Sequence, residues 1–280
     1  MSILKNTKTW LSLAGVVLAV VSFMAFTGKS EINDECYKTN TSFKNGETLV
    51  YKVYYNWQFV WLSAGEVTMN LRENADSYEV RVYGNTYESY DYFFKVRDYF
   101  YTKIDKQTLL PKNFVRIIQE GDYRLYDSIA FQQNTLSAVS FHGKSKETAV
   151  KKQFALNECM HDLVSILYSL RNTDTKTLVP GTQLPVKVFF DKEVYPVKLI
   201  YRGKEKNKKV KGLGTFNTLQ ISPFMVAGTV FKNSTEMKIW VSDDNNKIPL
   251  LIESPLSVGT GKAILKSYTN LRNSVTSKVN

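Results

Sequence analysis

The sequence predicts a mainly β protein: an antiparallel half-barrel or barrel-like sheet built from two pseudo-repeats, with one central helix. Segments rich in Val, Ile, Tyr and Phe recur with partial alternation, and Gly, Asp, Asn or Pro bound them, which is typical of strands. They do not alternate with helices, which favours antiparallel pairing. Several landmarks also occur twice at nearly constant spacing, which indicates an internal duplication.

Strand patterns begin after a polar stretch that ends at Ser42. The chain has 280 residues, of which 43% are hydrophobic, enough to bury a large core. Before the helix we predict strands at 47–57, 59–71, 78–87, 98–104, 112–120, 123–131 and 149–156. After it we predict strands at 183–191, 193–203, 208–212, 215–222, 236–242, 248–254 and 262–270.

One segment, at about 158–171, has helical periodicity. Apolar residues follow Cys159 at offsets of 4, 7, 8 and 11, which places them on one stripe of a helix. Asn157 can cap its start, and Arg171 suits its end. Because the segment lies between the two halves, we expect it to cover the concave side of the sheet.

The duplication rests on matched stretches in the two halves. GETLVYKVYY at 46–55 aligns without a gap with GTQLPVKVFF at 181–190. DKQTLLP at 105–111 and DDNNKIP at 243–249 each place an Asp six positions before a Pro that opens an apolar run. Asp and Pro are common turn residues, so we interpret both stretches as turns and not as sites.

The first residues form a targeting signal. Lys5 and Lys8 precede an uncharged stretch from Thr9 to Gly28, which is typical of a secretory signal peptide and is also long enough for an N-terminal anchor in the inner membrane. We expect export to the periplasm or cell envelope. The predicted organisation is a signal peptide or anchor at 1–28, a polar lead-in at 29–42, one domain at 43–272 with pseudo-repeats at about 46–155 and 181–270, and a tail at 273–280.

The cysteine and histidine content bounds the chemistry. Cys36 and Cys159 are the two cysteines, and an even number in an exported chain favours a disulfide over two separate thiols. Cys159 and His161 are two residues apart in the predicted helix, so they point in different directions and form no catalytic pair. Neither a zinc pattern, a G-x-S-x-G motif nor a Gly-rich phosphate loop occurs. We predict a non-catalytic protein without a metal or cofactor.

Two clusters are candidate binding surfaces. Aromatic residues of one parity either form core or line an apolar ligand cavity: Tyr51, Tyr55, Trp57, Phe59 and Trp61. The basic stretch RGKEKNKKVKG is expected to be a solvated hairpin tip, or else to contact anionic head groups through Arg202, Lys204, Lys206, Lys208 and Lys209. The net charge of +11 suits an anionic membrane surface, and nucleic acid is not expected in this compartment.

A resemblance covers nearly all of 43–272. The stretches NGETLVYKVYYNWQFVWLSAGEVTMNL, DYFYTKIDKQTLLPKNFVR, ECMHDLVSILYSLRN, FFDKEVYPVKLIYRGKE and WVSDDNNKIPLLIESPLSVGTGKAILKSY resemble a family of exported bacterial proteins, domain of unknown function 3108, as found in Bacteroidota. The resemblance implies an exported, mainly β protein and supplies no activity. The turn pattern formed by Asp105, Thr108 and Pro111 bears a weaker resemblance to a turn of the periplasmic lipoprotein-carrier fold. That fold is an open β half-barrel with a helix in its mouth.

Together these features predict a non-catalytic cell-envelope protein that binds an apolar or lipid-like ligand in a β half-barrel. Two alternatives remain open: a structural or interaction module of the envelope, whose protein partners the sequence does not name, and an envelope hydrolase whose carboxyl or serine residues the sequence cannot pair.

Overall fold

The computed structural model describes residues 37–57, 60–225, 235–255 and 259–279. The predicted signal segment and Cys36 lie outside these residues. Within them the mainly β prediction is confirmed, because the strands form one open antiparallel sheet in the order β8-β7-β6-β5-β4-β3-β2-β1-β15-β14-β13-β11-β10-β9, with β12 paired to β11. None of the helices in the described ranges combines the length and the apolar character needed to cross a bilayer.

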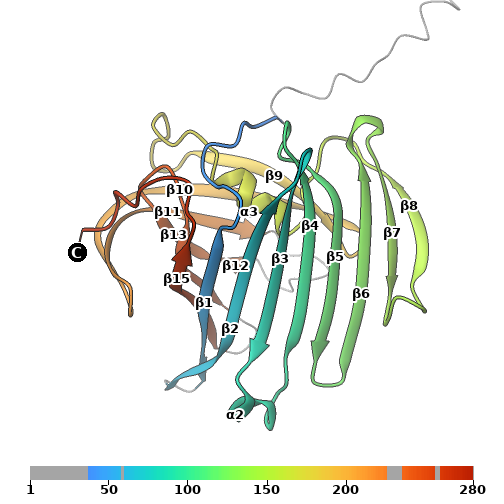
Figure 1. Ribbon diagram of the computed structural model, residues 1–280, viewed down its shortest axis with the longest axis horizontal. Coiled ribbons are helices and arrows are strands. Elements are labelled where there is room, and N and C mark those ends of the chain that lie inside the picture. The colour runs from blue at the N-terminus through green and yellow to red at the C-terminus, as the bar shows by residue number, and fades with distance from the viewer. Residues whose placement is uncertain (1–36, 58–59, 226–234, 256–258, 280) are drawn as a thin grey trace, which may run out of the picture. The chain divides into compact units, whose positions relative to one another are not determined.

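The first half of the chain is an uninterrupted meander, drawn from blue to green in Figure 1. Each strand pairs with the next in sequence, and β7 is a strand that the sequence reasoning missed. The strands are β1 (Thr48–Trp57), β2 (Val60–Glu73), β3 (Ser77–Thr86), β4 (Arg97–Asp105), β5 (Pro111–Glu120), β6 (Tyr123–Gln132), β7 (Ser137–Gly143) and β8 (Val150–Ala155).

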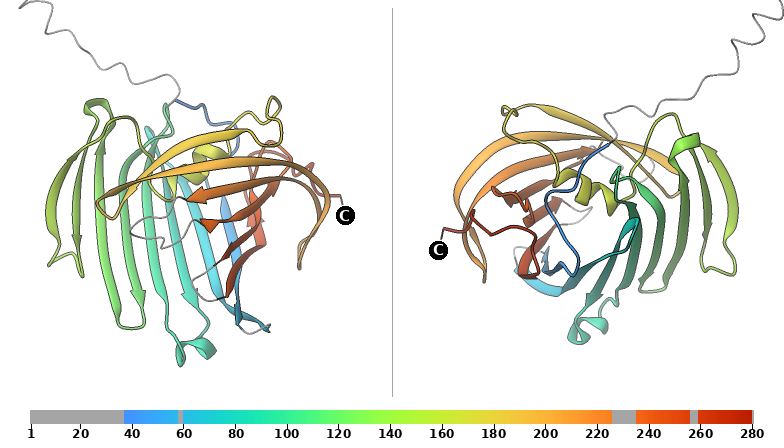
Figure 2. Two further views of the ribbon diagram at one scale, coloured as in Figure 1. Left: turned by 180° about the vertical axis from the view of Figure 1, so that it is seen from behind. Right: turned by 45° about the horizontal axis from the view of Figure 1, so that its top comes forward.

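The second half is another meander, and it joins the first through the pairing of β1 with β15. Figure 2 shows its orange strands arching across one face of the green ones, with the yellow helix between them. The strands are β9 (Gln183–Phe190), β10 (Glu193–Val210), β11 (Gly214–Met225), β12 (Thr235–Glu236), β13 (Lys238–Ser242), β14 (Pro249–Pro255) and β15 (Thr260–Thr269).

The two edges of the sheet are protected in different ways. The backbone of His161 covers part of β9, donating to the Lys187 carbonyl at 3.1 Å and accepting from the Phe189 amide at 2.8 Å. The other edge strand, β8, carries the exposed Lys151 and Lys152, and charged residues on an edge disfavour pairing with another strand. The sheet therefore stays open, as a half-barrel does.

The landmarks of the proposed duplication occupy comparable places in the two halves. Gly46 and Gly181 precede β1 and β9 with φ angles of +81° and +96°, a left-handed region that favours glycine. At the turns, however, the carboxylate of Asp105 accepts backbone N–H groups two and three residues ahead, and it is Asp244 that does so in the second half. The predicted match of Asp105 with Asp243 is therefore wrong by one residue; the repeat boundaries stay a prediction.

The central helix is shorter than predicted. α3 spans Ser165–Leu170, and the other short helices are α2 (Glu88–Asp91) and the 3₁₀ turn η2 (Gln133–Thr135). The predicted start at 158 is wrong because His161 is held in a bridge with Val188 of β9, which keeps the backbone extended there. The predicted cap, Asn157, is replaced by Asp162, whose Oδ1 accepts the amides of Val164 at 2.7 Å and Ser165 at 2.8 Å.

Candidate functional site

A buried ion pair fixes α3 over the concave face of the sheet. The guanidinium of Arg171 donates to both carboxylate oxygens of Glu47, at 2.5 and 2.8 Å, and neither side chain is more than 4% exposed. Its remaining donors reach the Ser42 carbonyl at 3.1 Å and the Asn246 carbonyl at 2.8 Å. Arg171 therefore ties the helix to the lead-in, to the start of β1 and to the turn before β14, and its charge is already neutralised.

Aromatic packing seats the same helix. The ring of Phe43, which is fully buried, meets Tyr78 of β3 and Tyr168 of α3 edge to face, with centroids 5.0 and 4.9 Å apart. Ser42 donates its hydroxyl to the Arg171 carbonyl at 2.7 Å. The segment predicted as a polar lead-in thus ends in residues that hold the helix in place.

Asp162 links α3 to the first half of the sheet and is expected to make stability depend on pH. It accepts a 2.6 Å hydrogen bond from Thr102 of β4, and burial raises its pKa from 3.8 to about 6 even though Thr102 and two backbone amides favour the charged form. The folded state therefore binds the Asp162 proton more tightly than the unfolded chain does, so the contribution of Asp162 to stability falls as pH rises from about 4 to about 6 and is constant at higher pH.

Replacing Asp162 with asparagine is expected to remove this pH dependence. Asn keeps an oxygen for the two helix amides, and its NH₂ group can donate to Thr102, whose own hydroxyl also reaches the Asn113 carbonyl. Urea unfolding should show Asp162→Asn about equal to wild type at pH 3.5 and about 2–3 kcal/mol more stable at pH 7. An equal difference at both pH values would contradict the prediction.

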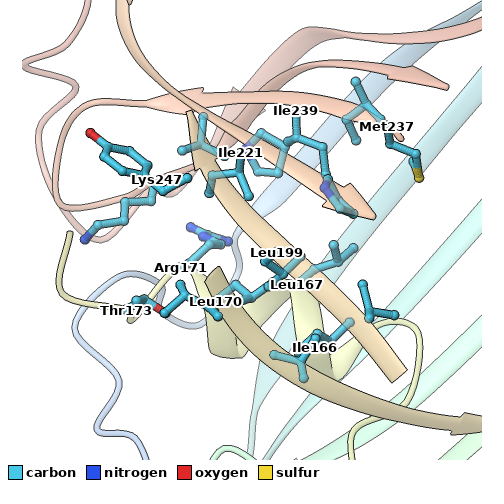
Figure 3. Close-up of a pocket in the computed structure, with 18 of the residues that line it drawn as sticks. Ile166, Leu167, Leu170, Arg171, Thr173, Leu199, Ile221, Met237, Ile239 and Lys247 are labelled. Atoms are coloured by element: carbon cyan, nitrogen blue, oxygen red, sulfur yellow. The ribbon is translucent and has the colours of Figure 1, made fainter. Parts of the chain in front are cut away.

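Three cavities lie along the concave face, beneath and beside α3. Cavity A has a volume of about 270 Å³ and lies between the helix and strands of the second half. Figure 3 shows Ile166, Leu167 and Leu170 of the helix facing apolar side chains of the strands, among them Leu199, Ile221 and Ile239. Arg171, Thr173, Tyr201 and Lys247 are polar members of its wall.

Cavities B and C continue cavity A toward the first half. Cavity B, of about 350 Å³, lies between α3 and strands that include β1, β2 and β15, and cavity C, of about 820 Å³, lies over β1 to β4 beside α2. Cavities A and B share Leu163, Leu167, Arg171, Pro249 and Ile252, and cavities B and C share Val67, Val82 and Phe100. The three cavities therefore adjoin one another and form a mainly apolar tract along the concave face.

A few polar groups border this tract. The Tyr168 hydroxyl, beside cavity B, is buried and has no hydrogen-bond partner among the described residues, and burial raises its pKa, so it remains a proton donor. Lys247 borders cavity A, and burial lowers its pKa. Asp98 borders cavity C beside Glu120; burial raises the pKa of both carboxyl groups, and the charge of Asp98 raises that of Glu120 further.

The predicted aromatic face is divided by the structure. Tyr51 borders cavity B and Tyr55 borders cavity C, as expected for a lining. Trp61 is placed wrongly by the prediction: it pairs with Asn56, one position from the pair of Tyr55 with Leu62, so it faces the other side of the sheet. There the Trp61 side chain is 41% exposed, and the ammonium group of Lys262 lies over its ring. Phe59 and the side chain of Trp57 lie outside the described residues.

The basic cluster is a strand and not a hairpin tip. Residues 202–210 belong to β10, and three of the five predicted head-group contacts already have acidic partners. Arg202 pairs with Glu236 at 2.5 Å, Lys204 with Asp243 at 2.9 Å, and Lys208 with Glu205 at 3.2 Å. Lys208 also lies 3.8 Å from the ring centroid of Trp240. Lys206 and Lys209 are exposed and form no ion pair with any described residue.

Cys159 lies in the extended segment that leads from β8 to α3 and is half-buried. Its neighbour Met160 is fully buried, and the side chain of Gln133 brackets the Met160 backbone with hydrogen bonds of 2.8 and 3.3 Å. The segment that carries Cys159 is thus fixed to η2, the turn that follows β6. Because Cys36 lies outside the described residues, the disulfide stays a prediction.

The fold and the cavities define an open antiparallel half-barrel with a helix over its concave face and an apolar interior. The chain belongs to the family described as proteins of unknown function, DUF3108, whose model matches residues 50–266. The resemblance inferred from the sequence is therefore confirmed. No curated protein matches the sequence.

A solved structure shows a similar fold. The chain is similar to a β-barrel-like protein of domain of unknown function DUF1849 from Brucella abortus, with a TM-score of 0.56 and 9% sequence identity over 82% of this chain and 99% of that one. A match to a "putative lipoprotein" from Parabacteroides distasonis has 12% identity over 83% of this chain and 99% of that one, but its TM-score of 0.31 is too low to indicate a shared fold.

Proposed function

We propose that this chain is a non-catalytic protein of the cell envelope that binds a lipid-like ligand, with a long acyl chain lying along cavities A, B and C. The observation that carries the proposal is that the three mainly apolar cavities adjoin one another along the concave face, because neighbouring cavities share wall residues. An elongated apolar tract suits an acyl chain better than a compact, polar metabolite.

The energetics support a chain-like ligand. Each methylene group transferred from water to an apolar cavity contributes about 0.8 kcal/mol, so roughly ten of them give about 8 kcal/mol before the entropy lost on binding is subtracted. The buried hydroxyl of Tyr168 offers one hydrogen bond to an ester or carboxyl oxygen of such a ligand at cavity B. Arg171, in contrast, is committed to Glu47 and is not a counter-ion for the ligand.

The alternatives have less support. For a hydrolase, the carboxyl groups of Asp98 and Glu120 would have to act together on a substrate in cavity C, but Asp98 borders this cavity and Glu120 is not among its wall residues. An interaction module would have to act through the sheet edges or the basic strand. His161 covers part of the edge strand β9, the edge strand β8 carries exposed lysines, and three of the five predicted basic contacts are already in ion pairs. The ligand-binding proposal therefore remains the better explanation of the concave face.

The proposal is tested by asking what the purified protein carries and what it takes up. Lipid extraction followed by mass spectrometry is expected to recover an acyl-chain lipid at a fixed ratio to protein. After delipidation, the fluorescent fatty acid cis-parinaric acid is expected to bind and to be displaced by unlabelled fatty acid. If no lipid co-purifies and the probe does not bind, the proposal fails.

A further inference from the structure

Three consecutive aromatic side chains protrude at one end of the first half. Tyr92, Phe93 and Phe94, which we call the aromatic loop, are 91%, 78% and 53% exposed. They follow α2, which Figure 1 shows beyond the ends of the neighbouring strands. We propose that the aromatic loop inserts into the surface of a lipid bilayer and docks the protein there.

Four backbone amides of α2 and the aromatic loop are hydrogen-bonded within this segment. The amides of Phe93 and Phe94 both donate to the Tyr90 carbonyl, at 2.9 and 3.1 Å. The amides of Tyr90 and Asp91 donate to the Tyr87 carbonyl at 2.8 and 3.2 Å. Paired amides matter because an unsatisfied backbone group is strongly disfavoured in a lipid environment.

The base of the loop is rigid. The carboxylate of Asp91 accepts two hydrogen bonds from Arg97, at 3.0 and 2.5 Å, and one from the Thr86 hydroxyl at 2.6 Å. Gly121 of the next hairpin packs under Phe94, and a Cβ atom there would lie 3.2 Å from the ring. The rings are therefore presented by a fixed scaffold, and their exposure is not the result of a loose loop.

The loop is continuous with the interior of the half-barrel. Tyr90, Phe93 and Phe94 form part of the wall of cavity C. Insertion of these rings would bring cavity C to the bilayer. A hydrocarbon chain could then pass between the bilayer and the cavity without crossing water. The docking inference goes beyond the proposed ligand binding and does not depend on it, because the rings are exposed whether or not the cavities are filled.

Local charge indicates that the rings, and not basic residues, provide the attraction. Lys95 and Arg124 are exposed beside the loop, but so are Glu88 and Asp122, which leaves little net charge there. Tyr123 on the adjacent turn is 57% exposed and adds a fourth ring. Aromatic side chains prefer the membrane interface, and each ring that leaves water favours binding by about tenfold or more.

The test places a reporter at the tip of the loop. Phe93→Trp in the full chain is mixed with vesicles of phosphatidylethanolamine and phosphatidylglycerol that carry brominated acyl chains, which quench tryptophan on contact. Val179→Trp is the matched control, because Val179 is 66% exposed and lies outside this loop. After subtraction of the wild-type signal, quenching at position 93 is expected to be at least about twofold stronger than at position 179.

Three results would overturn the proposal. The first is equal quenching at positions 93 and 179, which is also the result expected if the protein attaches to the vesicles only through its N-terminal segment. The second is loss of the position-93 signal at about 1 M salt, where the Debye length is about 3 Å and charge attraction is screened. The third is loss of that signal when Lys206→Glu and Lys209→Glu are added, because the basic strand would then be the docking surface. Failure of parinaric acid binding would leave the docking inference intact.

Discussion

Replacing Arg171 with methionine is expected to lower the free energy of unfolding by about 3–5 kcal/mol. The substitution leaves the carboxylate of Glu47, which is 0% exposed, without a counter-charge, and an unpaired buried charge is far more costly than a missing surface contact. It also removes the side-chain donors to the Ser42 and Asn246 carbonyls. Urea unfolding followed by tryptophan fluorescence measures the loss.

Two comparisons make this result specific to the buried pair. Arg202→Met breaks an ion pair of similar length whose partners are 38% and 40% exposed, and it is expected to change stability by less than about 1 kcal/mol. Combining Arg171→Met with Glu47→Leu removes both buried charges and should recover about 2 kcal/mol or more of the loss. If Arg171→Met costs no more than Arg202→Met, the pair does not hold the helix as described.

Local patterns predicted most of the strands, though not β7, and the stripe of the helix. The stripe residues Leu163, Ile166, Leu167 and Leu170 do face the cavities, although the helix itself begins at Ser165. Periodicity reports which side chains share a face, but the start of the helix is set by the pairing of His161 with β9. That contact joins distant parts of the chain and leaves no local signal.

The misplaced surface residues have the same kind of cause. Residues of one parity share a face only within a single strand. Across the turn after β1, the hairpin pairing places Trp61 opposite Asn56, on the other side of the sheet from Tyr55. The acidic partners of Arg202 and Lys204 lie 34 and 39 residues away on other parts of the sheet. Charge counting along the sequence therefore gave a free basic patch where the fold forms ion pairs. The exposed rings of the aromatic loop were also missed, because a run of Tyr and Phe carries no local signal of whether its side chains are buried or exposed.

Replacing Gly84 with phenylalanine is expected to reduce the affinity for long-chain fatty acids by roughly fiftyfold. Gly84 lies on β3 in the wall of cavity C, and a Cβ atom there would make ordinary contacts, 3.6 Å from Val67 Cγ2 and 3.8 Å from Asp98 Cβ. The ring therefore has room to enter the cavity. Excluding about three methylene groups of the ligand would cost about 2.4 kcal/mol, which corresponds to that loss of affinity.

The matched control for this prediction is Gly84→Ala, which fills almost none of the cavity. Both substitutions replace a glycine in the middle of a strand, so both should leave the fold intact or stabilise it slightly. Displacement of parinaric acid by palmitate separates them: the alanine variant should bind as wild type does, and the phenylalanine variant should not. Wild-type affinity in both variants would place the acyl chain outside cavity C. Loss of binding in both variants would indicate a disturbed sheet instead of a filled cavity.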